Sequence, residues 1–209
     1  SWEGLGYYAR ARNLHAAARQ IVVEHNGRIP DTFEALLILP GVGRYTAGAV
    51  ASIAFGQDVP AVDGNVRRVL ARASAIREDV GRSAVQRKLE TLAAELLPMG
   101  QAGVFNEALM ELGATVCTPR TPRCARCPLR ELCQAYATGE QETLPAKRPR
   151  KPTPHYDVAA AVTINQDGAD CSSPCVLVAQ RNADDMLGGL WEFPGGKCED
   201  GETLPECLA

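Results

Sequence analysis

The sequence predicts a mainly α-helical domain followed by part of an α+β domain. Three observations predict this order. Apolar residues recur at helical spacing through residues 1–137, prolines and basic residues crowd residues 138–154, and short β-prone runs follow. We therefore expect a helical domain over 1–137, a linker over 138–154 and a partial second domain over 155–209.

The helical part divides into segments with recognisable ends. We expect a first helix from near Gly6 to about Glu24, because Asn26-Gly27 is a helix-stop signal. A second helix, Ala35 to Leu39, should have Asp31 as its N-cap within a capping box. A third helix should begin after Gly43, with its inner face formed by Ala47, Val50, Ala51 and Ala54. A fourth should cover residues 83–97, and a fifth should contain Phe105, Leu109, Leu112 and Val116.

The composition is that of a globular chain without a membrane partner. Of 209 residues 45% are hydrophobic, and neither a signal peptide nor an apolar run of bilayer length is present. We therefore expect a cytoplasmic protein. The net charge of −3 argues mildly against nucleic acid, but the charge is uneven. Residues 120–151 contain eight basic and three acidic residues, a bias that suits either a phosphate-binding surface or a solvated linker. The basic residues are Arg120, Arg123, Arg126, Arg130, Lys147, Arg148, Arg150 and Lys151.

Four cysteines form the densest motif of the chain. They follow the spacing C-x6-C-x2-C-x5-C, at Cys117, Cys124, Cys127 and Cys133. Thiolates this close can surround one cationic centre. Zinc sites commonly use two C-x2-C pairs and this loop has one, so the spacing favours an iron–sulfur cluster. Zinc, disulfides and plain buried thiols remain as alternatives.

Two further motifs point to a phosphate backbone and to a fixed carboxylate. Leu39-Pro40-Gly41-Val42-Gly43 lies between two expected helices, where glycines permit a tight turn and the next helix offers its N–H groups to an anion. An ordinary helix–helix turn is the alternative. In Val62-Asp63-Gly64-Asn65-Val66-Arg67-Arg68, Asp63 begins a helix. Its carboxylate serves either as an N-cap alone or as an anion that stabilises positive charge on a sugar.

Together these motifs resemble the helix-hairpin-helix DNA glycosylases. The motifs are LPGVGRYTA (39–47), VDGNVRR (62–68) and the cysteine loop. The resemblance narrows to the bacterial adenine DNA glycosylases because of WEGLGYY (2–8), Tyr45 and the trailing β-prone domain. The resemblance implies a 4Fe-4S cluster and a nucleoid-associated monomer acting on double-stranded DNA. That family hydrolyses the N-glycosidic bond of adenine mispaired with 8-oxoguanine or guanine, after flipping the base out of the duplex.

The resemblance also implies roles for individual residues. Asp63 corresponds to the catalytic aspartate, and Asn65 to the asparagine that positions it. Tyr45 stands where relatives of the endonuclease III type carry a Schiff-base lysine, which favours a glycosylase without lyase activity. Tyr7, supported by Leu5, resembles a wedge that enters the base stack, with burial in the core as the alternative for either tyrosine. DNA contacts are expected from Leu5, Tyr7, Leu39, Gly41, Val42, Gly43, Arg44 and Arg126.

Two alternative functions are an endonuclease III-like glycosylase/lyase and a non-catalytic lesion-binding DNA module. The family's general-acid glutamate lies upstream of WEGLGYY, so we expect a chain truncated at both ends that is inactive, or nearly so, by itself. Depurination without acid assistance loses roughly 10²–10⁴ in rate.

The second domain contains the start of a Nudix-like motif. Gly188 to Lys197 leads to Gly196-x5-Glu202, which resembles the opening of a Nudix box. In adenine glycosylases this fold reads 8-oxoguanine, and nucleotide hydrolysis is the alternative. The cysteines of this domain are Cys171, Cys175, Cys198 and Cys207, for which scattered free thiols are expected and a second metal site is the alternative.

Overall fold

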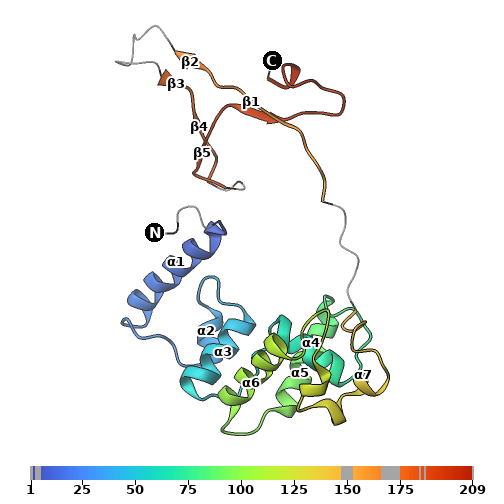
Figure 1. The fold of residues 1–209 in the computed structure, drawn as a ribbon. Helices are drawn as coiled ribbons and strands as arrows, with labels where there is room; N and C mark the ends of the chain where they lie inside the picture. The colour runs from blue at the N-terminus through green and yellow to red at the C-terminus, as the bar shows by residue number, and fades with distance from the viewer. Residues whose placement is uncertain are drawn as a thin grey trace. The chain divides into compact units, whose positions relative to one another are not determined.

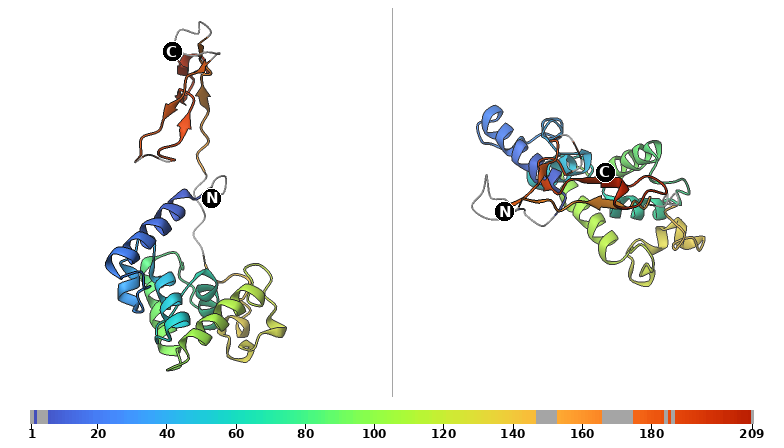
Figure 2. Two further views of the ribbon diagram at one scale, coloured as in Figure 1. Left: turned by 90° about the vertical axis from the view of Figure 1, so that its left-hand side faces the viewer. Right: turned by 90° about the horizontal axis from the view of Figure 1, so that it is seen from above.

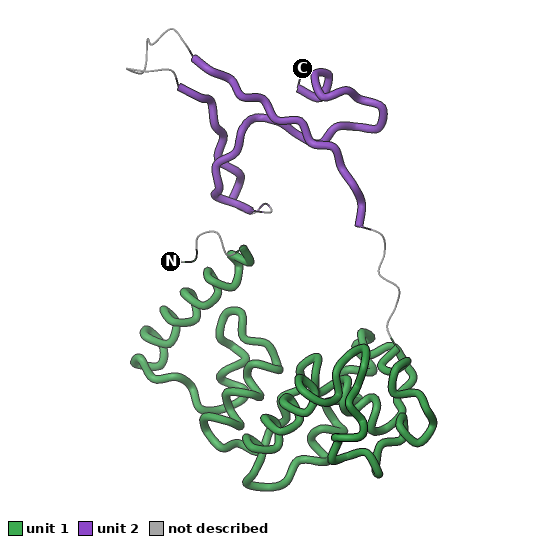
Figure 3. Tube along the Cα trace, in the orientation of Figure 1, with its two compact units in different colours: residues 1–149 green, residues 150–209 purple. Residues whose placement is uncertain are grey.

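The structure is a computed structural model, and it describes Trp2 and residues 6–146, 153–165, 175–183, 185 and 187–208. The chain forms two compact units, residues 1–149 and residues 150–209 (Figure 3). Within the described residues, no helix is both long enough and apolar enough to span a bilayer.

The first helices of unit 1 share a small core. Helices α1 (Tyr8–Glu24), α2 (Phe33–Leu37) and α3 (Arg44–Phe55) pack together (Figure 1). They bury Ala17, Leu36, Ala47 and Ala51 together with Leu39 of the turn after α2. Helix α1 ends as expected, because Asn26 and Gly27 both have positive φ and the Gly27 N–H returns to the Ile21 carbonyl at 3.0 Å.

A second and larger core surrounds α4 (Gly64–Ala73). This helix packs against α5 (Ser83–Leu96), α6 (Ala102–Thr115) and α7 (Gln134–Ala137) (Figures 1 and 2). Its Val66, Val69 and Leu70 are buried together with Val85, Leu89 and Leu109 of the neighbouring helices. The central position of α4 matters for function, because its first turn carries the Asp63 motif.

Helix α6 joins the two cores through a buried polar contact. The Asn106 amide donates to Ser52 Oγ and to the Val59 carbonyl, both at 2.9 Å, and its Oδ1 accepts the Ala61 N–H at 3.1 Å. Asn106 is 2% exposed, so these bonds satisfy its amide where water cannot. The segment that leads into Asp63 is thereby fixed to both α3 and α6.

Two local predictions are wrong. The N-cap of α2 is Thr32 rather than Asp31: Thr32 has extended backbone, and its Oγ1 accepts the Ala35 N–H at 3.3 Å. Helix α2 therefore begins two residues earlier than expected and ends at Leu37. On α3 the expected inner residue Ala54 is exposed, because the buried face runs through Ala47, Gly48, Ala51 and Ser52.

The described residues of unit 2 form three short antiparallel strand pairs. They are β1 (Val158–Ala160) with β6 (Gly195–Lys197), β2 (Ile164–Asn165) with β3 (Cys175–Val176), and β4 (Ala179–Gln180) with β5 (Trp191–Glu192). A 3₁₀ turn, η3 (Glu206–Leu208), packs on β1 and β6. The β-prone runs of the sequence are confirmed as strands, but each is split into two. The expected free thiol at Cys175 is wrong, since this cysteine is disulfide-bonded, and Cys171 lies outside the described residues.

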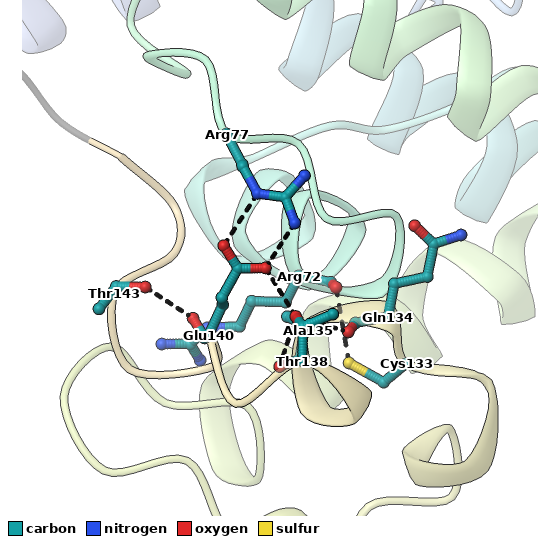
Figure 4. A network of polar contacts seen from close by, with 8 residues as sticks. All are labelled: Arg72, Arg77, Cys133, Gln134, Ala135, Thr138, Glu140 and Thr143. Carbon is teal, nitrogen blue, oxygen red and sulfur yellow. Dashed lines mark hydrogen bonds and ion pairs between the residues drawn. The ribbon is translucent and has the colours of Figure 1, made fainter.

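A surface ion pair fixes the segment after α7 to the α4–α5 connection. Both Glu140 carboxylate oxygens accept from Arg77, at 2.8 and 2.7 Å, and Thr138 Oγ1 donates to the same carboxylate at 2.6 Å (Figure 4). These donors, Arg77 first, lower the pKa of Glu140 from 4.5 to about 2. The ionised carboxylate is therefore the form that the fold favours.

The lowered pKa predicts a pH-dependent contribution of Glu140 to stability. A carboxyl group with a depressed folded-state pKa stabilises the fold above its unfolded pKa, and this contribution disappears as the pH falls from 4.5 towards about 2. In urea unfolding, the midpoint difference between the wild type and Glu140→Gln should be constant above pH 5.5 and shrink below pH 4.5. A difference of the same size at every pH would contradict this prediction.

Candidate active site and metal centre

Both carboxylate oxygens of Asp63 are held at the start of α4. Its Oδ1 accepts the Val66 N–H at 2.7 Å, and its Oδ2 accepts the Asn65 amide Nδ2 at 3.0 Å. The predicted helix start is thus confirmed, and Asp63 is its N-cap. A carboxylate at a helix N-terminus is stabilised in its charged form by the N–H groups and the helix dipole. The structure brings Asp63 and Asn65 together as the sequence predicts.

Arg68 continues this chain of contacts to the cysteine loop. Its Nη2 donates to Asn65 Oδ1 at 2.8 Å and to the Gly113 carbonyl at 2.7 Å, and its Nε donates to the Cys117 carbonyl at 2.7 Å. Arg68 is 9% exposed, and burial lowers its pKa. A continuous hydrogen-bonded path therefore runs from the Asp63 carboxylate to the first cysteine of the loop.

Gly113 makes room for this path. A Cβ at this position would lie 2.6 Å from the Asn65 Cβ and 3.0 Å from the Asn65 backbone. A side chain there would displace the first turn of α4, and Asn65 with it. Helix α6 thus needs glycine at Gly113 because the two helices approach closely, which is a packing requirement and not one of backbone conformation.

Arg72, one turn further along α4, holds the start of the loop. The guanidinium donates to four acceptors: the Leu144, Thr118 and Pro119 carbonyls at 2.8, 2.7 and 3.0 Å, and Cys117 Sγ at 3.3 Å. Its own carbonyl faces Cys133 Sγ at 3.6 Å (Figure 4). Arg72 is 1% exposed, so it places a buried positive charge beside Cys117, the first of the four cysteines.

The four loop cysteines line one cavity of about 30 Å³ together with Arg72, Pro122, Arg130 and Tyr136. Cys124 begins the short 3₁₀ turn η1 (Cys124–Arg126) and Cys127 follows it, while Cys133 follows a second turn, η2 (Arg130–Leu132). The Arg123 N–H closes the loop on the Val116 carbonyl at 2.9 Å. Burial raises the pKa of Cys124 and Cys127, and the neighbouring thiols raise it further. A cationic centre would reverse this, because coordinating cysteines are thiolates.

The arrangement fits a cluster better than a single zinc ion. Four tetrahedral sulfurs at the usual Zn–S distance of about 2.3 Å lie only about 3.8 Å apart. No three of the loop thiols lie within 4.8 Å of one another; among the described residues, only Cys198, Glu202 and Cys207 bring three ligand atoms that close together. The loop thus spreads its four thiols around a shared space, as a polynuclear centre requires.

The hairpin has the geometry that its glycines predict. Gly41 has φ +76° and its missing Cβ would lie 2.6 Å from Asn13 Cβ of α1, while the Val42 N–H donates to the Leu39 carbonyl at 3.1 Å. Gly43 is the N-cap of α3 and provides no side-chain cap. The first N–H groups of α3 are therefore open to an external anion.

The other residues expected to contact DNA occupy different environments. Arg44 is exposed but donates to Glu90 at 2.9 Å and stacks over Phe33. Tyr45 is 41% exposed, with its hydroxyl 3.5 Å from Met110 Sδ, and it lines an 80 Å³ cavity that reaches Val62. Tyr7 is 82% exposed, and Arg126 is exposed on η1. Leu5 lies outside the described residues.

Three residues of this site have no role in the sequence-based prediction. They are Arg68, Arg72 and Asn106, all buried and polar. Arg68 and Arg72 lie four residues apart on the α4 face that also carries the apolar Val69, a pattern that indicates buried rather than solvated arginines. Asn106 has no comparable local signal.

Comparisons with known proteins agree with this geometry. The profile of the HhH-GPD superfamily base excision DNA repair proteins matches residues 1–95, that of the iron-sulfur binding domain of endonuclease III matches residues 117–133, and that of the NUDIX domain matches residues 154–209. The chain therefore contains the iron–sulfur binding loop predicted from its four cysteines.

Curated relatives include two adenine DNA glycosylases. The human protein is 41% identical, and the match covers 97% of this chain and 44% of the human protein. The Mycobacterium tuberculosis protein is 54% identical, and the match covers 62% of this chain and 42% of that protein. This chain thus spans less than half the length of these relatives. Among solved structures, a thermostable thymine-DNA glycosylase has a TM-score of 0.55 at 37% identity, covering 62% of this chain and 59% of its own. A non-covalent endonuclease III–DNA complex has a TM-score of 0.54 at 32% identity, and the match covers 65% of this chain and 61% of that chain.

The four-acceptor contact of Arg72 predicts that lysine cannot replace it. Lys keeps the charge but lacks the planar donor fork, so Arg72→Lys should lower the free energy of unfolding by on the order of 2 kcal/mol and speed iron loss to a chelator. Urea unfolding and the visible absorbance of the iron-loaded protein measure the two effects. Arg77→Lys is the matched control, because Arg77 is exposed and contacts Glu140. Equal effects of both substitutions would contradict the prediction.

Proposed function

The chain belongs to the HhH-GPD superfamily of base excision DNA repair proteins, and we propose that it hydrolyses the N-glycosidic bond of adenine mispaired with 8-oxoguanine or guanine in double-stranded DNA. The observation that carries this proposal is the Asp63 carboxylate, held through both oxygens at the first turn of α4. We further propose that the protein acts as a monomer on nucleoid DNA.

The chemistry follows from the charge that develops at the sugar. As the bond between C1′ and adenine breaks, its electron pair leaves with the base and positive charge builds on the deoxyribose. An ionised Asp63 beside C1′ lowers the energy of that state. Its bonds to the Val66 N–H and to Asn65 hold the carboxylate in one orientation before the substrate arrives, and water then completes hydrolysis at C1′. Proton donation to the departing adenine is assigned to no residue of this chain.

The hairpin and the cysteine loop would hold the duplex on either side of Asp63. The open N–H groups after Gly43 suit one DNA phosphate. The exposed Arg120, Arg123 and Arg126 suit others, because they extend from the loop that the four cysteines hold. When bound, a 4Fe-4S cluster supplies cross-links among the four thiolates and so fixes these arginines in place. Tyr7, exposed at the start of α1, suits insertion beside the flipped base.

Two features support hydrolysis without strand cleavage. Tyr45 occupies the hairpin position that would hold a lysine in a lyase, and a phenol cannot form an imine with the sugar. The lysines of the chain are Lys88, Lys147, Lys151 and Lys197, none of them in the hairpin; Lys88 is on α5 and pairs with Glu78 at 3.3 Å. We therefore propose a monofunctional glycosylase. For unit 2 we propose recognition of 8-oxoguanine, on the basis of the NUDIX match.

Asp63→Asn should reduce adenine release by at least about 100-fold while leaving duplex binding within a few-fold, because an amide can still cap α4 but carries no charge. The measurement is single-turnover release of adenine from an adenine:8-oxoguanine duplex, with binding followed by gel shift. Asp58→Asn is the control, since Asp58 also accepts backbone N–H bonds, from Gly100. Unchanged release in Asp63→Asn, or a covalent adduct trapped by borohydride, would contradict the proposal.

Arg126→Ala should weaken binding to all duplex sequences alike and lower the slope of log Kd against log salt by about 1. Arg130→Ala is the matched control on the same loop, because Arg130 is already paired with Glu131 at 2.7 Å. Binding to a matched and a mispaired duplex, titrated at several salt concentrations, tests this. Equal slopes for Arg126→Ala and the wild type would exclude a phosphate contact by Arg126.

A further inference from the structure

Three metal-ligating side chains meet in unit 2, separate from the cysteine loop. The thiol sulfurs of Cys198 and Cys207 and a carboxylate oxygen of Glu202 all lie within 4.8 Å of one another. All three residues are partly buried, whereas Glu199, Asp200 and Glu206 around them are exposed. The group therefore combines two soft ligands and one hard ligand at a spacing that one ion can bridge.

Backbone geometry brings these residues together. Cys198 directly follows β6 and its N–H donates to the Asp157 carbonyl at 2.9 Å, so it is tied to the strand pair β1–β6. Gly201, with φ +88°, turns the chain, and Cys207 returns on η3. Helix-like bonding keeps η3 in place, because the Cys207 N–H donates to the Thr203 carbonyl at 3.0 Å.

The ligand atoms also have partners that orient them. The Glu199 N–H donates to Glu202 Oε2 at 2.8 Å, which fixes the carboxylate and leaves its other oxygen available. Cys207 Sγ lies 3.6 Å from the Gly196 carbonyl, to which its thiol donates. Hydrogen bonds of this kind around the ligands are what metal sites use to hold their first coordination shell.

From this arrangement we propose that Cys198, Glu202 and Cys207 bind one zinc ion. The two thiolates and one carboxylate provide three of four tetrahedral positions, and the fourth is open to water or to another ligand. The site cross-links the end of β6 to η3 and so stabilises this part of unit 2. It needs only small movements, since ligand atoms around zinc lie about 3–4 Å apart.

The electrostatics of the group favour a cation. Two thiols and one carboxylate, each of which can become an anion, lie within 4.8 Å of one another. Three groups that form anions thus face one another. Among the described residues the nearby cation Lys197 lies over the Tyr156 ring, 4.0 Å from its centroid, and makes no ion pair with the three groups.

The test is a zinc titration of the chain with its cysteine loop already loaded with iron, under argon and with a phosphine reductant. Iron loading occupies the four loop thiols, so zinc uptake reports other sites. We expect one zinc per chain, measured by calorimetry and by metal analysis after desalting. Cobalt in place of zinc should give thiolate-to-metal charge-transfer absorption.

The variants separate ligation from folding. The double variant with Cys198→Ser and Cys207→Ser should lose the zinc and the cobalt absorption, with iron content unchanged. Glu202→Gln keeps an oxygen that can accept the Glu199 N–H, so it should weaken zinc binding at least tenfold without disturbing the turn. Asp200→Asn, an exposed neighbour, should bind zinc like the wild type. No zinc uptake by the iron-loaded chain, or equal uptake by the double cysteine variant, would overturn the proposal.

Discussion

The hydrogen bonds that Arg68 and Arg72 donate from α4 to the cysteine loop are the interaction on which the helical unit depends. Helix α4 otherwise meets its neighbours through aliphatic side chains, which fix distance but not register. The two guanidinium groups fix the register of the helix, because the N–H donors of each planar group point in fixed directions and require the carbonyls to lie there. Through them, the first turn of α4 and the start of the loop occupy one defined relative position.

Two buried arginines are costly to desolvate, and the surrounding atoms show how the cost is offset. Arg68 has three acceptors within 2.8 Å, and Arg72 has four within 3.3 Å, of which one is a thiol sulfur. Carbonyl dipoles aimed at a cation, and thiolates when a metal centre is bound, replace the water that the side chains lose. The loop and the helix therefore stabilise each other, and neither is expected to hold its conformation alone.

The features that the sequence predicts well are those encoded by neighbouring residues. The cysteine spacing, the turn glycines of the hairpin and the helix start at Asp63 each depend on a few consecutive positions. Arg68 and Arg72 could not be assigned in this way, because their acceptors other than Asn65 lie 45 to 72 residues further along the chain. Asp31 and Thr32 are adjacent and both suit an N-cap, so composition alone could not choose between them. Ala54 shows the same limit for packing: a small apolar residue near the inner face is exposed because α3 turns its Gly48 side towards Pro60.

The capping bond of Asp63 has a consequence for how its position can be observed. The Val66 N–H that donates to Asp63 Oδ1 belongs to the backbone of the helix that the same carboxylate begins. Any rotation of the carboxylate away from its resting orientation breaks this hydrogen bond. The exchange rate and chemical shift of this one amide therefore form an intrinsic probe of carboxylate orientation. It can be followed by magnetic resonance in the resting protein, without DNA and without turnover.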